Sequence, residues 1–484
     1  MAWSLTKDQE RFIKRYAQSL DSGDGALFAG AGLSRAAGYV DWRSLLEDVA
    51  ADLGLDSHRE SDLIAIAQYH LNEKKNRAHL NQTIVDQLAG SPQPTPNHRI
   101  LARLPIPTVW TTNYDQLLER AFEQAGKVVD LKLTQENLAQ SKRDRDVVLY
   151  KMHGCVTQPQ DAVLTKDDYE QYAQKRQLFV ESLKGDLIAK TFLFLGFSFT
   201  DPNIDYILSR VRILVGENGR EHFCLMRTPK RPSGLNKQEQ EDYDYGLRAT
   251  KLRQADLLRF GIETIWVDEF AHIELLLQKL AAFNHRKSVF VSGAAHDSAP
   301  LGQDRLNSLA RDLGARLMKD GYNLVSGFGL GLGEHCVVGA LRALYGIPKA
   351  SEADRLVVRP FPGAGGMDDR QQRTQHREDL IARSGVVVVI AGNRAQAGGI
   401  EDSPGVMEEV ELALREGKCV IPIGATGHAA RTLWERAGGD PTRYLPGIEA
   451  KSEWPVLGDT GASNEQLLNA VFQLLAKAEK AAAI

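Results

Sequence analysis

The sequence predicts an α/β protein with two domains, each a doubly wound parallel sheet covered by helices. Three observations support this fold class. Short apolar runs alternate with helical patterns along the chain, which is typical of parallel sheets. Most of these runs end directly in glycine or polar residues, as strands do at the edge where ligands bind. A polar break at residues 284–287 divides 484 residues into two such series, and this length accommodates two or three domains.

The first series begins with an apolar run at residues 27–29, which we expect to be a strand. The next apolar residues have helical spacing: Leu45, Leu46, Val49 and Leu53. Further apolar runs end at Thr112, Met152 and Leu195, and later strands are expected at 222–226 and 262–267.

The second series predicts a smaller domain of the same type. A helix through Arg316 follows its first strand. The expected strands are 288–291, 323–325, 356–358, 386–390 and 420–423.

Composition excludes several classes of protein. The net charge of -4 argues against a general nucleic-acid binder, and no run of about 20 apolar residues suggests a membrane span. The N-terminus lacks the apolar core of a secretory signal. The cysteines are scattered and form no Cys-x-x-Cys pair, so we expect neither disulfides nor a metal site: Cys155, Cys224, Cys336 and Cys419. We therefore expect a cytoplasmic protein.

A glycine-rich turn at residues 28–34 joins the first strand to a helix. Glycine allows the backbone to approach a pyrophosphate, and the following helix N-terminus attracts its charge. The strict G-x-G-x-x-G pattern fails because Arg35 occupies the third glycine position. The turn alone is explained equally well as a plain strand–helix connection.

Four other segments accompany this turn: Gly-Tyr-Val-Asp-Trp at 38–42, Thr-Thr-Asn-Tyr-Asp at 111–115, His-Gly at 153–154 and Gly-Phe-Ser-Phe at 196–199. In this order they resemble the sirtuin motifs. The resemblance implies a Rossmann-like NAD site, with Asn113 and His153 as its catalytic residues. The expected NAD-binding residues are Ala29, Gly30, Gly32, Ser34, Asp41, Asp115, Gly196 and Ser198.

The residue types suit cleavage of NAD. Nicotinamide leaves as a neutral molecule, so the site must stabilise an oxocarbenium-like ribose and position the attacking group. The amide of Asn113 offers a donor and an acceptor, and because histidine ordinarily titrates near neutrality, His153 is expected to take a proton from water or a hydroxyl. For Asp115 a helix N-cap remains an equal alternative, and for Ser198 a loop role does. Asp201 is expected to start a helix.

Two departures from sirtuin deacylases favour water over an acetyl-peptide as the acceptor. The zinc module of two Cys-x-x-Cys pairs is absent, and Thr112 replaces the glutamine of the T-Q-N-I-D motif. The I-P-D-F-R stretch is only partly matched at residues 38–42.

The second series carries glycine-rich strand ends at 291–295 and 325–333, and the latter is a candidate phosphate nest. Together with residues 359–362 and 403–409 it resembles the SLOG superfamily of nucleotide-handling domains. The G-T pair of the related LOG phosphoribohydrolases is lost, so binding is expected rather than hydrolysis. Arginine suits phosphate and glutamate suits ribose hydroxyls. The expected signal-binding residues are Gly293, Gly327, Gly329, Arg377, Arg394 and Glu409.

Over nearly its full length the sequence resembles the ThsA family, the NADase effectors of the bacterial Thoeris anti-phage system. The shared segments are 28–34, 102–106, 110–115, 150–154, 191–210, 326–331, 359–362 and 422–427. The resemblance implies that a sirtuin-like domain at 1–284 hydrolyses NAD to nicotinamide and ADP-ribose. It also implies that a SLOG domain at 285–484 senses a cyclic ADP-ribose isomer made by a TIR-domain partner. A homo-oligomer, expected to be a tetramer, is implied as well.

Three alternatives remain. An NAD-dependent protein deacylase is disfavoured by the missing zinc cysteines. A binding-only sensor with an inactive sirtuin half is disfavoured by the presence of Asn113 and His153. A LOG-type phosphoribohydrolase is disfavoured by the missing G-T pair.

Overall fold

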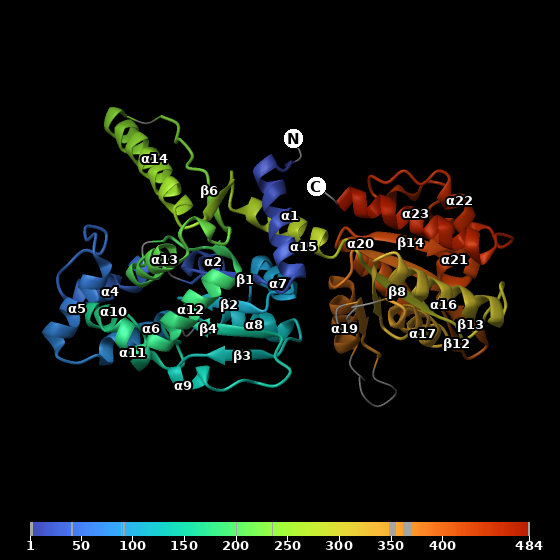
Figure 1. Cartoon of the computed structure of the whole chain (residues 1–484), viewed down its shortest axis with the longest axis horizontal. Helices are drawn as coiled ribbons and strands as arrows, with labels where there is room; N and C mark the ends of the chain where they lie inside the picture. Colours follow the sequence, from blue (N-terminus) through green and yellow to red (C-terminus); the bar gives the residue numbers. More distant parts are fainter. Residues whose placement is uncertain are drawn as a thin grey trace. The chain divides into compact units, whose positions relative to one another are not determined.

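The computed structural model describes residues 3–39, 42–88, 90, 92–199, 201–234, 236–347, 355–361 and 370–482. The chain divides into two compact units, Met1–Ala281 (unit 1) and Ala282–Ile484 (unit 2). Both are sheets with helices packed on them, as Figure 1 shows. Among the described residues, no helix is long and apolar enough to cross a membrane.

Within its described residues, unit 1 is built on a seven-stranded sheet in the order β3-β4-β2-β1-β5-β6-β7. Neighbouring strands pair in parallel throughout. The strands are β1 (Gly25–Ala29), β2 (Thr108–Thr111), β3 (Val129–Lys132), β4 (Val147–Lys151), β5 (Thr191–Leu195), β6 (His222–Arg227) and β7 (Ile262–Val267). Every residue of β1 and β5 is buried, because helices cover both faces of the central strands.

The helices of unit 1 connect these strands and cover them. They are α1 (Lys7–Asp21), α2 (Ala31–Arg35), α3 (Trp42–Leu45), α4 (Glu47–Asp52), α5 (Leu63–Lys74), α6 (Ala78–Leu88), α7 (Pro96–Arg103), α8 (Leu117–Gln124), α9 (Gln135–Leu138), α10 (Lys166–Glu170), α11 (Tyr172–Lys175), α12 (Gln177–Ala189), α13 (Pro202–Val215) and α14 (Lys237–Leu258). The next helix, α15 (Ala271–Asn284), begins in unit 1 and includes the first three residues of unit 2. Helices α3 to α6, here called the helical lobe, lie between β1 and β2 in sequence. Their apolar cluster includes Leu46, Ile66, Ile84, Tyr114 and Leu164.

Unit 2 has a five-stranded sheet in the order β10-β9-β8-β11-β14, counted over its described residues and parallel throughout. The strands are β8 (Ser288–Ala294), β9 (Asn323–Ser326), β10 (Leu356–Val358), β11 (Val386–Ala391) and β14 (Cys419–Ile423). An antiparallel hairpin, β12 (Asn393–Gln396) and β13 (Gly399–Asp402), follows β11. The helices are α16 (Gln303–Lys319), α17 (Gly333–Tyr345), α19 (Arg370–Ala382), α20 (Pro404–Arg415), α21 (His428–Arg436), α22 (Glu453–Gly458) and α23 (Asn464–Ala482).

The predicted fold class is confirmed in both units. The expected strands at 262–267 and 356–358 match β7 and β10 residue for residue. The expected helix over Leu45–Leu53 is divided into α3 and α4, because Leu46 leaves the helical conformation between them. The sequence patterns did not predict β3, the β12–β13 hairpin or α14, a long helix whose one buried described residue is Leu257.

Candidate functional site

The four sirtuin-like motifs of unit 1 meet at one edge of the sheet. Strands β4, β2, β1 and β5 are consecutive neighbours and parallel, so their carboxyl ends lie together. His153, Asn113, Gly30 and Gly196 follow the ends of these four strands. This edge is where parallel α/β sheets bind ligands.

Glycines in the turn and in the loop after β5 allow two backbone segments to pack directly on each other. The N–H of Gly32 donates to the carbonyl of Gly196 at 2.9 Å. A Cβ on Gly30 would lie 2.4 Å from that carbonyl oxygen, and a Cβ on Gly196 would lie 2.3 Å from the nitrogen of Leu33. Gly196 also has a φ of +67°, which favours glycine. These glycines are therefore required by the contact between the two loops.

The side-chain amide of Asn113 is held in one orientation. Its nitrogen donates to the carbonyl of Gly30 at 3.0 Å and to the hydroxyl of Ser34 at 2.9 Å. The Ser34 hydroxyl in turn donates to Oδ2 of Asp115 at 2.7 Å. Oδ1 of Asn113 is buried and has no hydrogen-bond partner among the described residues. The amide therefore presents an unpaired acceptor at the edge of the sheet.

Asp115 has two structural contacts. Its Oδ1 accepts the N–H of Leu117 at 2.9 Å at the start of α8, and its Oδ2 accepts the Ser34 hydroxyl. The sequence left a capping role and a catalytic role equally open. In the structure Gln116 is the N-cap of α8, and Asp115, one residue earlier, accepts the first helical N–H and the Ser34 hydroxyl that contacts Asn113.

Lys151, which the motif analysis did not single out, supports the loop that carries Asn113. Its ammonium is buried and donates to Glu119 Oε1 at 2.8 Å, to the Tyr114 carbonyl at 3.3 Å and to the Asp115 carbonyl. Burial opposes its charge, but the Glu119 carboxylate together with the nearby Cys155 and Asp115 outweighs burial and raises the pKa of Lys151. A lysine inside an otherwise apolar strand was the signal in the sequence, since buried lysines are rare unless paired.

His153 is 2% exposed and lies against Tyr169 and Tyr172. Burial lowers the pKa of its imidazole, and the nearby Asp201 carboxylate opposes this effect. Nε2 lies 3.3 Å from Oδ2 of Asp201. A lowered pKa keeps the ring neutral near pH 7, as a proton acceptor requires.

Asp201 is the N-cap of α13, as the sequence predicted. Its Oδ1 accepts the N–H groups of Asn203 and Ile204, at 2.9 and 3.2 Å. Its second oxygen faces His153, from which it is separated by 48 residues of sequence. No local pattern could have revealed this contact.

Three further NAD-binding candidates complete the prediction. Ala29 is buried at the end of β1, and Ser198 is exposed in the loop after β5. Asp41 lies outside the described residues.

In unit 2, Glu409 lies between Ser292 of β8 and Arg377 of α19. Ser292 donates to Glu409 Oε2 at 2.5 Å, and Arg377 Nε lies 3.6 Å from Glu409 Oε1. Burial raises the pKa of Glu409 to about 7. Arg377 also pairs with Glu408 at 3.0 Å and stacks on the ring of Phe361, 4.9 Å away. Ser292 and Glu408 were not among the predicted signal-binding residues.

The candidate glycines of unit 2 lie near the residues that contact Glu409 and Arg377. A Cβ on Gly293 would lie 2.4 Å from the Ile390 carbonyl oxygen, and one on Gly329 would lie 1.8 Å from the carbonyl oxygen of Gly293. Gly327 lies against Phe361, so it is connected to Arg377 through that ring. As in unit 1, the glycines permit close contact between the ends of neighbouring strands.

Arg394 is placed differently from the other signal-binding candidates. It lies on the β12–β13 hairpin, its side chain is 58% exposed, and it pairs with Glu401 at 2.6 Å across the hairpin. Its contact is thus within the hairpin rather than with Arg377 or Glu409.

Among the described residues, one group has potential metal ligands within reach of each other: Asp52, His70 and His79. It belongs to the helical lobe. Asp52 is already paired with the ammonium of Lys74 at 3.0 Å and with His70 at 2.9 Å. The negative charge of the Asp52 carboxylate is thus already paired within the helical lobe.

Two family models match separate parts of the chain. The family described as a SIR2-like domain matches residues 107–250, and the Sir2- and TIR-associating SLOG family matches residues 272–478. An NAD(+) hydrolase ThsA from Bacillus cereus (strain MSX-D12) is 41% identical over 470 residues, which are 96% of this chain and 98% of the relative. A second, from Cytobacillus dafuensis, is 38% identical over 480 residues, 98% and 97% of the two chains. The defense-associated sirtuin 2 of Bacillus subtilis is 28% identical over 225 residues, 45% of this chain and 22% of that one.

Proposed function

This chain belongs to the ThsA family of NAD(+) hydrolases, and on that premise we propose that unit 1 hydrolyses NAD to nicotinamide and ADP-ribose. The trigger is a cyclic ADP-ribose isomer, made by a TIR-domain partner, that binds unit 2. The resulting loss of NAD stops phage propagation in the infected cell. The observation that carries the proposal is the fixed amide of Asn113, whose Oδ1, without a partner in the described part of the chain, lies at the ligand-binding edge of the sheet.

The reaction exchanges one bond at the ribose for another. The bond between C1′ and the nicotinamide nitrogen breaks, its electron pair leaves with neutral nicotinamide, and positive charge develops on the ribose. The oxygen of a water molecule then bonds to C1′, and the proton it loses passes to His153 and on to solvent. Asn113 Oδ1 accepts a hydrogen bond from that water or from a ribose hydroxyl. Burial suits both residues, because it excludes competing solvent.

Regulation follows from the closed state of this site. Asn113 is 7% and His153 2% exposed, so entry of NAD requires residues around them to move. A change from about 1% to about 99% active needs roughly 5.5 kcal/mol of differential binding. Charge-assisted hydrogen bonds contribute about 1.5–3 kcal/mol each, so two or three contacts from Arg377 and its neighbours suffice.

We place this activity in the cytoplasm, in a homo-oligomer expected to be a tetramer. Gly293, Gly327, Gly329, Arg377, Arg394 and Glu409 are the proposed contacts for the signal. Arg377 and Glu409 have the best support, since they lie 3.6 Å apart and Glu409 also contacts Ser292 of β8.

The test is nicotinamide release from NAD by the purified full chain, with and without each cyclic ADP-ribose isomer. We expect release to rise sharply with one isomer.

Asn113→Ala and His153→Ala should abolish release while retaining isomer binding, and Arg377→Ala should lose activation while NAD binding persists. Release that does not depend on any isomer would remove the sensor from the proposal. A His153→Ala protein with the parent rate would refute the catalytic assignment, and an acetyl-peptide assay tests deacylation instead.

A further inference from the structure

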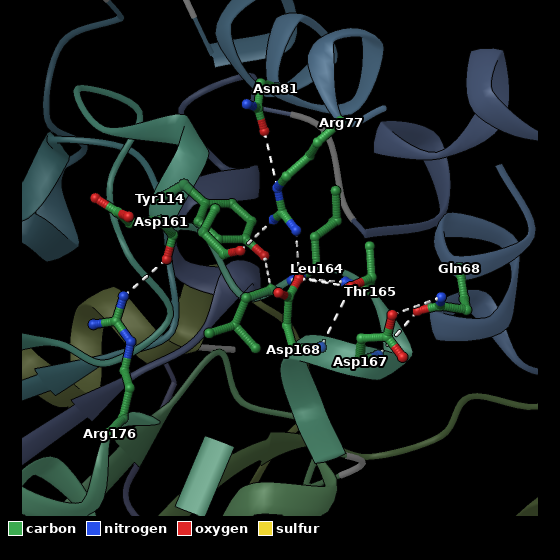
Figure 2. Close-up of polar contacts among 12 residues, drawn as sticks. Gln68, Arg77, Asn81, Tyr114, Asp161, Leu164, Thr165, Asp167, Asp168 and Arg176 are labelled. Atoms are coloured by element: carbon green, nitrogen blue, oxygen red, sulfur yellow. Dashed lines mark hydrogen bonds and ion pairs between the residues drawn. The ribbon is translucent and has the colours of Figure 1, made fainter. Parts of the chain in front are cut away.

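Arg77 lies in the helical lobe, in the short connection between α5 and α6, and binds three partners at once. Its Nε donates to Asn81 Oδ1 at 3.0 Å, and Nη1 donates to Asp168 Oδ2 at 2.7 Å. Nη2 donates to the carbonyl of Ala162. Figure 2 shows the guanidinium between Asn81 and the carboxylate of Asp168. All three nitrogens of the guanidinium are therefore engaged, which a lysine could not reproduce.

The carboxylate of Asp168 that contacts Arg77 also accepts hydrogen bonds from residues just before Asp168. Its Oδ2 accepts the N–H of Leu164 at 3.1 Å, the N–H of Thr165 at 2.9 Å and the Thr165 hydroxyl at 2.8 Å. Burial opposes the charged form, but the contacts to Arg77 and Thr165 outweigh it and lower the pKa of Asp168. Residues 162–168 are thus tied to Arg77 near both ends.

The first residues of that segment, Ala162 and Val163, contact both candidate catalytic loops. The N–H of Val163 donates to the carbonyl of His153 at 2.9 Å. The hydroxyl of Tyr114, the residue after Asn113, donates to the carbonyl of Val163 at 2.7 Å. A Cβ on Gly154 would lie 3.0 Å from Cα of Ala162, so the segment also packs directly on the residue after His153.

We propose that Arg77 is a positioning residue for NAD cleavage: through Ala162 and Asp168 it holds residues 162–168 against the main chain of His153 and keeps that ring buried. This inference rests on the function proposed above. Arg77 contacts neither Asn113 nor His153 among its hydrogen bonds, so it acts through the segment.

Asp161, the residue just before this segment, has an attachment that does not involve Arg77. Arg176 donates to the carbonyl of Asp161 at 2.8 Å, a contact drawn in Figure 2, and to the carbonyl of Leu133 at 2.7 Å. Loss of Arg77 therefore loosens the segment without releasing it entirely. Water then reaches His153, and the pKa of its ring rises toward the ordinary value.

The variant to make is Arg77→Met, with Arg15→Met as its matched control. Arg15 also pairs with a carboxylate, Glu221, at 2.7 Å in unit 1, but that pair is exposed. In the activated full chain we expect Arg77→Met to lower kcat for NAD by about 10–100-fold with little change in KM, since small misplacements of catalytic groups have effects of this size. The acid limb of kcat should move to higher pH. Arg15→Met should match the parent.

A second readout needs no activity: deuterium exchange at the C2 position of each histidine, followed by mass spectrometry across pH. Arg77→Met should speed exchange at His153 and raise its titration midpoint, whereas Arg15→Met should not. A folded Arg77→Met protein with unchanged exchange at His153 overturns the inference. So does one whose loss of activity comes with lowered thermal stability and an unmoved pH profile, which indicates a purely structural role. Failure of the parent to release nicotinamide counts against the proposed function alone, because the exchange result decides the position of His153 separately.

Discussion

Burial shifts the pKa values of His153 and Glu409, one side chain from each candidate site, in opposite directions. It lowers the pKa of His153, because the charged imidazolium loses its hydration on burial. It raises the pKa of Glu409 to about 7, because the charged carboxylate likewise loses its hydration. Both shifts favour the neutral form. His153 is thereby kept ready to accept a proton, while Glu409 makes the stability of unit 2 depend on pH.

For Glu409 the direction of that dependence follows from the raised pKa. The folded chain retains a proton between the ordinary value of 4.5 and about 7, whereas the unfolded chain releases it. The stabilising contribution is thus fully present below the lower value and is lost as pH rises through the higher one. We expect the loss to be about 3 kcal/mol.

Urea unfolding of the full chain at about pH 5 and about pH 8 measures this effect. Glu409→Gln cannot ionise, so its stability difference between the two conditions should be smaller than that of the parent by most of this amount. Glu411→Gln, on the same helix but with a side chain 52% exposed, is the control and should behave as the parent does. Equal pH dependence in Glu409→Gln and the parent would contradict the prediction.

At the scale of elements, strand β4 connects the two candidate catalytic loops. His153 follows its end, and Lys151 within it reaches the carbonyls of Tyr114 and Asp115 after β2. The ion pair between Lys151 and Glu119 of α8 has side chains 0% and 9% exposed. A charge left alone at such a depth is strongly unfavourable.

We therefore expect Lys151→Met to lower the free energy of unfolding by about 3–5 kcal/mol, because it leaves Glu119 buried without a partner. The double variant Lys151→Met/Glu119→Leu should recover most of this loss. NAD cleavage should stay impaired in the double variant, since the carbonyls of Tyr114 and Asp115 still lack their donor. Denaturant unfolding and nicotinamide release distinguish these effects, and full activity in the double variant would show that Lys151 does not support the loop.

The elements differ in how far they could be predicted. Strands β7 and β10 match the expected bounds because buried parallel strands are apolar runs of defined length. The β12–β13 hairpin was missed because its exposed sequence has no apolar alternation, and Arg394 was consequently assigned without its partner Glu401. The contacts of His153 with Asp201, and of Arg77 with Asp168, join distant parts of the chain. Local patterns contain no information about such pairs.

At the scale of the whole molecule, the proposed activation requires the signal to displace contacts already present in unit 2. Arg377 pairs with Glu408 at 3.0 Å and stacks on Phe361. Thr374 donates to the other oxygen of Glu408, so this carboxylate is held in place on both sides by α19. A phosphate approaching Arg377 must compete with an internal anion.

Glu408 should accordingly raise the concentration of signal needed for activation. Replacement by glutamine retains the shape and a neutral acceptor but removes the competing charge. We expect Glu408→Gln to lower the half-activating concentration of the effective isomer by about tenfold, which corresponds to about 1.4 kcal/mol. Nicotinamide release titrated against the isomer measures this shift, and isomer binding measured by calorimetry should shift equally. A higher half-activating concentration in Glu408→Gln would show instead that Glu408 orients Arg377 for the signal, because the guanidinium would then need that carboxylate in order to reach the phosphate.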